Sequence, residues 1–259
     1  MWATIDTASN GGDPVYHEAI YVTHGSGLLK LCLVETEKGK VPFISSIEVV
    51  PLTLSLYPRM ETSAIFHLVT RTNFGGDEIR FTGPLTEEKY NRIWTRGETP
   101  SYIKVYTSSN VNNLENDPPS DLLSNSIRPL VVSDPIILTV DFPQLTPQPA
   151  YFVLYFSELE YSSNPIGARI MQIKINGQYE QTVVAPEYGH CKVVTIYPVM
   201  VVGPTINITL ASTGVSTLPP MIAGMEVFTK QANGSNGTRR HFCFVFMFVH
   251  VISLVLLLV

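Results

Sequence analysis

The feature that most constrains the fold is a two-residue alternation of apolar and polar side chains, repeated in short segments along the chain. It is clearest in ARIMQIKINGQYEQTVV, where Met171, Ile173 and Ile175 alternate with polar residues. A period of two places these three side chains on one face of a β-strand. Asn176-Gly177 then supplies the two residues of positive φ that a type I′ turn requires. We therefore predict a β-hairpin whose second strand covers residues 179–184.

The same alternation recurs in segments 29–33, 136–142 and 206–210, which indicates strands buried on one face. In the last of these segments it places Asn207 on the solvent side. Residues 150–156, AYFVLYF, are apolar throughout, which indicates a central strand covered on both faces.

Helical signals are scarce. Residues 86–94, TEEKYNRIW, begin with a candidate N-cap, Thr86, and acidic residues follow it, so we expect one short helix or turn there. Residues 110–128 are polar and contain Asp117-Pro118-Pro119, which indicates a loop. The 17 glycines and 19 prolines are spread between the short strands as turn residues. Together these patterns predict an all-β chain, an antiparallel β-sandwich or jelly roll.

Charge and motifs narrow the function. The net charge is −5 and no basic patch is present, which argues against nucleic acid as a partner. The histidines lack HExxH or His-x-His spacing, and Gly25-Ser26-Gly27 lacks the form of a nucleophile elbow. We expect no enzyme activity, no cofactor and no metal site.

The chain has three cysteines, and Cys243 lies in an apolar tail. Only Cys32 and Cys191 remain to pair within the folded part, and the sequence leaves open whether they do so or stay as free thiols.

The last 19 residues, 241–259, are almost entirely apolar. As a helix they would span about 28 Å, close to the ~30 Å hydrocarbon core. Their length and lack of alternation argue against a terminal strand. Two hypotheses remain: a retained transmembrane helix, or a glycosylphosphatidylinositol (GPI) signal in which Asn233 or Ser235 receives the lipid. The charges of Arg239-Arg240 on the outer side favour the lipid signal.

Three N-glycosylation sequons begin at Asn207, Asn233 and Asn236. They indicate passage through the secretory pathway. The N-terminus, MWATIDTASN, has neither the basic nor the apolar region of a signal peptide.

Several strings, in this order along the chain, resemble those of the malectin-like domain found outside the membrane in many plant receptor-like kinases. They are CLVET (32–36), VPFISSIEV (41–49), RTNFGG (71–76), IRF (79–81), YNRIW (90–94), YFVLYFSEL (151–159), IKING (173–177) and STLPPMIAGMEVF (216–228). One segment departs from the family pattern: TGPLT, at 82–86, replaces the usual Pro-Asp-Asp portion.

The resemblance implies a domain organisation. Residues 1–58 would be the C-terminal part of a first malectin-like subdomain, and residues 59–230 a second one. Residues 231–240 would be a polar spacer and residues 241–259 the hydrophobic tail. The chain would then be a kinase-less relative that lacks the start of the first subdomain.

The resemblance also implies a non-catalytic recognition module on the extracellular face of the cell membrane. Its partner would be cell-wall carbohydrate, as animal malectin binds glucose oligomers, or a secreted peptide or co-receptor. Alternatives are a non-functional fragment, or a cell-wall hydrolase using two carboxylates among Asp77, Glu78, Glu158 and Glu160.

Sugar rings stack on aromatic faces while carboxylates or amides hold their hydroxyls. On that basis the candidate ligand-binding residues are Asp77, Tyr90, Trp94 and Tyr155. The competing interpretation makes Trp94 a core anchor and Tyr155 a packed residue in the middle of a strand.

Overall fold

The structure is a computed structural model. It describes the chain except residues 1–14, 23–26, 36–37, 40, 42, 54, 81–87, 114, 143–144, 162–167, 232–240, 249–251 and 259. For residues 27–30, 241–248 and 252–258 it describes the backbone alone.

The described chain is almost entirely β, as predicted, with antiparallel sheets and one short helix. The elements are β1 (Val15–Tyr21), β2 (Gly27–Val34), β3 (Ser46–Pro51), β4 (Ile65–Asn73), β5 (Thr95–Arg96), β6 (Ile103–Tyr106), α1 (Ser120–Leu123), β7 (Asn125–Arg128), β8 (Ile136–Asp141), β9 (Gln148–Ser157), β10 (Ile170–Ile175), β11 (Gln178–Val184), β12 (Cys191–Val201), β13 (Thr205–Ser212), β14 (Gly224–Lys230), β15 (His241–Phe248) and β16 (Ile252–Leu258).

The chain divides into two compact units. One comprises Val69–Phe228, and the other comprises Met1–Leu68 together with Thr229–Val259. The boundaries that the family resemblance implies, at residues 58 and 230, stay a prediction.

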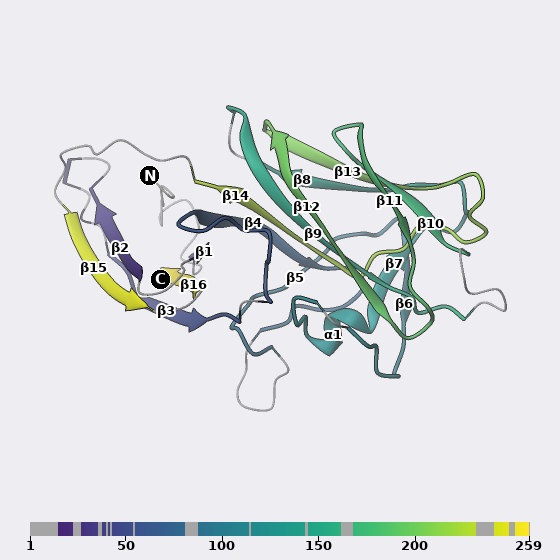
Figure 1. Cartoon of the computed structure of the whole chain (residues 1–259), viewed down its shortest axis with the longest axis horizontal. Helices are drawn as coiled ribbons and strands as arrows, with labels where there is room; N and C mark the ends of the chain where they lie inside the picture. Colours follow the sequence, from purple (N-terminus) through teal and green to yellow (C-terminus); the bar gives the residue numbers. More distant parts are fainter. Residues whose placement is uncertain are drawn as a thin grey trace. The chain divides into compact units, whose positions relative to one another are not determined.

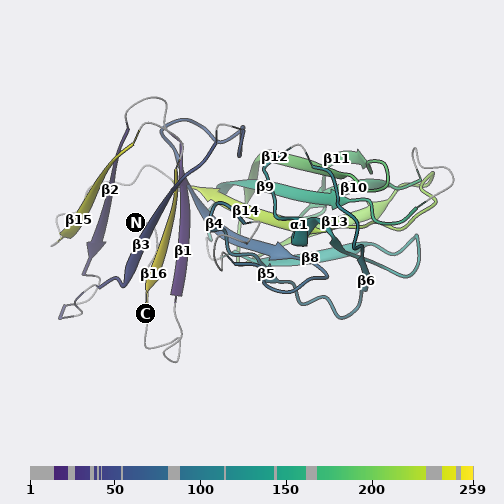
Figure 2. The same cartoon turned by 90° about the horizontal axis from the view of Figure 1, so that it is seen from below.

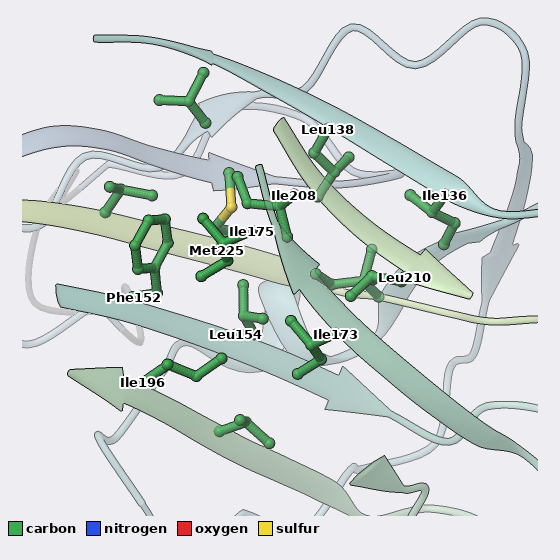
Figure 3. Packing of buried hydrophobic residues seen from close by; sticks show 14 of the residues in the cluster. Ile136, Leu138, Phe152, Leu154, Ile173, Ile175, Ile196, Ile208, Leu210 and Met225 are labelled. Atoms are coloured by element: carbon green, nitrogen blue, oxygen red, sulfur yellow. The ribbon is translucent and has the colours of Figure 1, made fainter. Parts of the chain in front are cut away.

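The Val69–Phe228 unit is a β-sandwich. One sheet has the strand order β12-β9-β14-β4, and the other has the order β11-β10-β13-β8. Figure 1 shows the two sheets lying face to face. Their inner faces enclose an apolar core to which both sheets contribute, as Figure 3 shows for Phe152 and Leu154 of β9 opposite Ile173 of β10.

The alternation in the sequence predicts which side chains face this core. On β8, Ile136, Leu138 and Val140 are buried while the residues between them are exposed, so this prediction is confirmed. β10 and β13 show the same alternation. β9 is buried on both faces from Ala150 onward, as its uninterrupted apolar run predicts.

The predicted hairpin is also confirmed. β10 and β11 pair in antiparallel register, with Ile175 opposite Gln178. Asn176 and Gly177 have φ values of 49° and 80°. Because an asparagine or glycine adopts positive φ at little cost, this pair makes the tight turn.

For residues 86–94 we expected a short helix or turn. Residues 86–87 lie outside the described residues, and the rest of the segment contains a turn at 89–90 and no helix. A second local prediction was wrong. Residues 110–128, predicted as a loop, contain α1 and β7. Leu122 and Leu123 are buried, so a short turn of helix forms after Pro119 in spite of its polar surroundings.

In the other unit the chain's end supplies two strands. β16 lies between β1 and β3 and pairs with both in antiparallel register, while β15 pairs with β2. Figure 2 shows β1, β16 and β3 side by side, and β2 beside β15. β1 also pairs with the first residues of β4.

This arrangement overturns the argument against a terminal strand. Nineteen residues are too long for one strand, but the tail divides into two, and a continuous apolar run is as compatible with strands as with a helix. In the described part of the chain, no helix has the length and apolar character needed to cross a membrane.

The cysteines agree in part with the alternatives that the sequence left open. Cys191 is a free thiol, which was one of them. Cys32 is disulfide-bonded, and in the antiparallel register of β2 and β15 its backbone lies opposite that of Cys243. A disulfide at Cys32 with Cys191 free was not predicted, because the sequence analysis placed Cys243 in a tail outside the fold.

His67 on β4 is a partly buried histidine of the unit that comprises Met1–Leu68 and Thr229–Val259. Its Nε2 lies 3.0 Å from Gln231 Oε1. Burial is the main cause that lowers the pKa of His67 to about 4. The unfolded chain, with an ordinary histidine pKa of about 6.5, therefore binds a proton that the folded chain resists.

We predict that removing the tail exposes the strands it pairs with. In a chain lacking 241–259, backbone amides of β2 and β3 should exchange hydrogen much faster, because they lose β15 and β16 as partners. Deletion of 249–259 alone should release β3 and leave β2 protected. Amides of β9 in the other unit serve as the internal control. Unchanged protection of β2 and β3 in the full deletion would contradict the pairing.

We also predict a pH dependence. Since the folded-state pKa of His67 lies below the unfolded value, its contribution makes stability fall as pH drops from about 6.5 to about 4. His67→Gln removes the proton-binding group, so its thermal melting temperature should fall less steeply over that window. Equal slopes for the variant and the natural chain would count against a buried neutral His67.

Candidate functional site

The Val69–Phe228 unit contains a buried ion pair between neighbouring strands. Arg71 of β4 donates from Nε to Glu226 Oε1 of β14 at 2.6 Å, and both side chains are 0% exposed. The other carboxylate oxygen, Oε2, accepts a hydrogen bond from the hydroxyl of Tyr155 on β9 at 2.7 Å. Strands β9, β14 and β4 are consecutive in the sheet, which brings the three side chains together.

The pKa of Glu226 reflects this setting. Burial alone would raise it, but the positive charges of Arg71 and Arg92 and the hydrogen bonds from Arg71 and Tyr155 outweigh burial and lower it. The group is therefore a carboxylate held for structure, because it has no solvent access through which to exchange a proton with a substrate.

A second buried carboxylate, Glu88, lies in the segment that precedes β5. It accepts from Arg92 Nε at 3.0 Å and from Trp94 Nε1 at 3.1 Å. Arg92 also donates to two backbone carbonyls, those of Asn116 at 2.9 Å and Asp117 at 2.5 Å. Arg92 thereby ties the 88–94 segment to the turn before α1.

Trp94 connects the two ion pairs. The guanidinium carbons of Arg71 and Arg92 each lie 5.6 Å from the centroid of its ring, within the range of cation–π attraction. The Tyr155 ring meets it edge-on at 5.5 Å. We call this set the buried ionic cluster: Arg71, Glu88, Arg92, Trp94, Tyr155 and Glu226.

The structure places the four predicted ligand-binding residues in different environments. Trp94 and Tyr155 are 0% exposed within the buried ionic cluster. Tyr90 is half-buried, with its ring 5.1 Å from the guanidinium of Arg92 and its hydroxyl donating to Asp117. Asp77 is exposed and pairs with Arg96 at 3.2 Å. The structure brings Trp94 and Tyr155 into the buried ionic cluster and Tyr90 against its Arg92, but no described contact joins Asp77 to them.

The carboxylates nominated for a hydrolase are engaged by arginines. Arg169, itself 2% exposed, donates from Nε to Glu158 and from Nη2 to Glu160, each at 2.9 Å. Arg128 pairs with the other oxygen of Glu160 at 2.8 Å. Arg169 also donates to the carbonyl of Pro219. These contacts join the segment after β9 and the residue before β10 to β7 and to Pro219.

An open pocket of ≈ 580 Å³ lies between the 112–115 segment and the turn before β12. Its walls carry amides, carboxylates, an imidazole and an ammonium group, supplied by Asn112, Asn113, Glu115, Glu187, His190 and Lys192. Asn113 Oδ1 is buried there without a hydrogen-bond partner. The sequence did not predict this site, because its residues come from two loops with no motif.

Backbone hydrogen bonds hold the pocket in shape. Asn112 N donates to Gly189 O at 2.8 Å, and Cys191 N donates to Asn112 O at 2.8 Å. Gly189 has a φ of 78°, the left-handed conformation that lets the turn close. Cys191 also lines the pocket, but burial raises the pKa of its thiol to about 12, so it stays a neutral thiol and no nucleophile.

Two exposed aromatic rings lie close together here, one on the turn before β12 and one in the segment after β9. Tyr188 precedes Gly189 and is 43% exposed, and Tyr161 follows β9 and is 80% exposed. Their rings meet edge-on with centroids 6.1 Å apart.

Among the described residues, no group of three or more His, Cys, Asp or Glu side chains could hold a metal ion.

Residues 1–230 match the family model of the malectin-like domain, and the chain belongs to that family. A putative leucine-rich repeat receptor-like serine/threonine-protein kinase of Arabidopsis thaliana is 28% identical over 235 residues, which cover 88% of this chain and 25% of that protein. A probable LRR receptor-like serine/threonine-protein kinase of the same plant is 30% identical over 237 residues, covering 88% and 26%. The chain thus spans about a quarter of the length of these relatives.

Solved structures agree on the fold. The extracellular domain of ANXUR1 from Arabidopsis thaliana superposes with a TM-score of 0.55 at 16% identity, over 66% of this chain and 50% of that one. A plant complex of the peptide RALF23 with FER and LLG2 gives a TM-score of 0.55 at 14% identity, over 84% and 78%.

We predict that Arg71→Met destabilises the Val69–Phe228 unit by about 3–5 kcal/mol, because it leaves the Glu226 carboxylate buried without its charge partner. Arg96→Met is the matched control. Its pair with Asp77 is exposed, so its loss should cost less than about 1 kcal/mol. Chemical unfolding of both variants measures the difference, and equal effects would contradict the assignment.

Proposed function

We propose that this chain is a non-catalytic recognition module that works outside the cell and binds a secreted peptide or a co-receptor protein. The observation that carries the proposal is the open pocket, with polar groups on a mostly apolar lining, between the 112–115 segment and the turn at 186–190 of a malectin-like sandwich. Receptor-like kinases are the relatives of this chain, and FER, which has this fold, was solved with a peptide and a second protein.

The chemistry of the pocket suits a partner that offers both apolar surface and hydrogen-bonding groups. Asn112 and Glu187 offer hydrogen-bonding groups at its wall, and pockets with a few well-placed polar groups select ligands by orientation. The exposed Tyr188 ring adds an apolar contact beside them. By contrast, Glu158 and Glu160 are held by arginines, which supports a structural role for these carboxylates rather than acid–base catalysis.

A cell-wall carbohydrate is the second candidate ligand. The exposed pair of Tyr161 and Tyr188 favours it, because aromatic faces beside amide groups are what sugar rings stack on. Asn112 and Asn113 supply such amides at the pocket. We therefore propose the same pocket residues for both candidate ligands, and a binding screen is needed to tell the candidates apart.

We further propose that the module acts at the extracellular face of the cell membrane. Attachment of a lipid at Asn233 or Ser235 would remove residues 241–259, and with them the strands that pair with β1, β2 and β3. A lipid anchor and the paired tail are therefore alternatives. Both attachment candidates lie outside the described part of the chain, as does Asn236, and hydrogen exchange of β2 and β3 in the natural protein distinguishes the two alternatives.

The test is a binding screen of the secreted chain against secreted plant peptides, receptor ectodomains and a cell-wall glycan array. Asn112→Ala and Glu187→Gln should each lower the affinity for the ligand about tenfold, equivalent to about 1.4 kcal/mol for a lost polar contact. Glu98→Gln, an exposed carboxylate of the same unit away from the pocket lining, is the matched control.

A peptide or protein ligand that depends on the pocket residues supports the first candidate, and a glycan ligand supports the second. A ligand that binds both pocket variants as tightly as the natural chain would overturn the pocket as its site. Turnover of an arrayed glycan would overturn the non-catalytic proposal.

A further inference from the structure

Asn207 is the third residue of β13 and lies on the outer face of the β11-β10-β13-β8 sheet. The strand alternates between exposed and buried residues, with Ile206 and Ile208 in the core and Asn207 exposed. Thr209 is half-buried, two residues further along the same strand. Asn207-Ile208-Thr209 is an N-glycosylation sequon, and the fold presents its acceptor to solvent.

The hydrogen bonds around Asn207 leave the acceptor atom free. Its Oδ1 accepts from Thr139 Oγ1 of β8 at 2.9 Å, which fixes the orientation of the amide plane. Its backbone N–H donates to Asn176 Oδ1 at 2.9 Å. Nδ2, the atom that would bear a sugar, has no hydrogen-bond partner among the described residues, so a glycan there would displace no hydrogen bond of this atom.

The surrounding face presents exposed side chains that a first sugar could cover. Asn207 lies opposite Thr139 in the antiparallel register, and Thr209 lies opposite Ile137. Ile137 and Thr139 point to the same side of β8, and Ile137 is 52% exposed. A glycan on Nδ2 would therefore lie beside an exposed isoleucine that the fold otherwise leaves in water.

From this geometry we propose that Asn207 carries an N-linked glycan, which covers the outer face of the four-stranded sheet around Ile137. The proposal rests on the extracellular location proposed above, and it is independent of which ligand the pocket binds. Asn112 and Asn176, two other exposed asparagines, are not followed by Ser or Thr at the required position.

The modification is a group transfer from a lipid-pyrophosphate-linked oligosaccharide. The bond between the anomeric carbon and the pyrophosphate oxygen breaks, and a bond from that carbon to Asn207 Nδ2 forms. Nδ2 gives up one proton, and the lipid pyrophosphate leaves. No oxidant or reductant takes part.

The test uses the full chain behind a cleavable signal peptide, translated in the presence of microsomes. Asn233→Gln and Asn236→Gln are introduced first, so that Asn207 is the remaining sequon acceptor. Protease-protected chains should migrate one glycan step more slowly, and a peptide N-glycosidase that converts the glycosylated Asn to Asp should abolish the step. Peptide mass spectrometry should locate that Asp at position 207.

Thr209 provides the matched pair of variants. Thr209→Val keeps the shape of the side chain and removes the sequon hydroxyl, so the glycan step should disappear. Thr209→Ser preserves the sequon and should retain the step. Because glycans are added during translocation, the readout does not depend on whether a variant goes on to fold.

Translocated, protease-protected chains without a glycan at Asn207 would overturn the proposal. A step that persists in Thr209→Val would also overturn it. Failure of the ligand screen with a glycan present at Asn207 would count against the proposed function alone, so the two proposals fail separately.

Discussion

The Val69–Phe228 unit depends on a pair of charges buried between strands. Removing Arg71 and Glu226 from water costs several kcal/mol for each ion, and their attraction offsets that cost only if hydrogen bonds satisfy the remaining polar atoms. Tyr155 supplies one such bond, on the other carboxylate oxygen. The pair therefore specifies a single arrangement of β4, β9 and β14, because any slip of these strands would leave a charge without its partner.

The cluster extends this constraint to a segment with no regular structure. Trp94 contacts both arginines and donates to Glu88, and Arg92 donates to the carbonyls of the turn before α1. The 88–94 segment is thus held by contacts within itself, around Glu88, and by contacts with distant parts of the chain, and it contains a turn rather than a helix. Thr86, the candidate N-cap, lies outside the described residues.

Local patterns predicted the sandwich well and its polar interior poorly. The alternation at Met171, Ile173 and Ile175 and the Asn-Gly turn act within a few residues, so they can be recognised in sequence. Arg71 and Glu226 are 155 residues apart, and nothing near either one indicates that they meet. The pocket between the 112–115 and 186–190 loops was missed for the same reason, because its walls come from segments far apart in the sequence. The tail was predicted wrongly because its partners, β1, β2 and β3, lie at the opposite end of the chain.

The strings that resemble the malectin-like family have a physical meaning in this structure. RTNFGG contributes Arg71, YNRIW contributes Arg92 and Trp94, YFVLYFSEL contributes Tyr155, and STLPPMIAGMEVF contributes Glu226. All five residues belong to the buried ionic cluster. The family pattern therefore describes the framework of the sandwich, while we propose that the residues that select a ligand lie on surface loops such as 112–115 and 186–190.

We propose that Trp94, which is fully buried, belongs to this framework and does not serve as a platform for a ligand. Acrylamide quenching of its fluorescence tests that assignment, in a Trp2→Phe variant where Trp94 is the remaining tryptophan. We predict emission typical of a buried indole and very weak quenching, unchanged by glucose oligomers at any concentration tested. Strong quenching of the folded chain, or protection from quenching on addition of the sugar, would contradict the assignment.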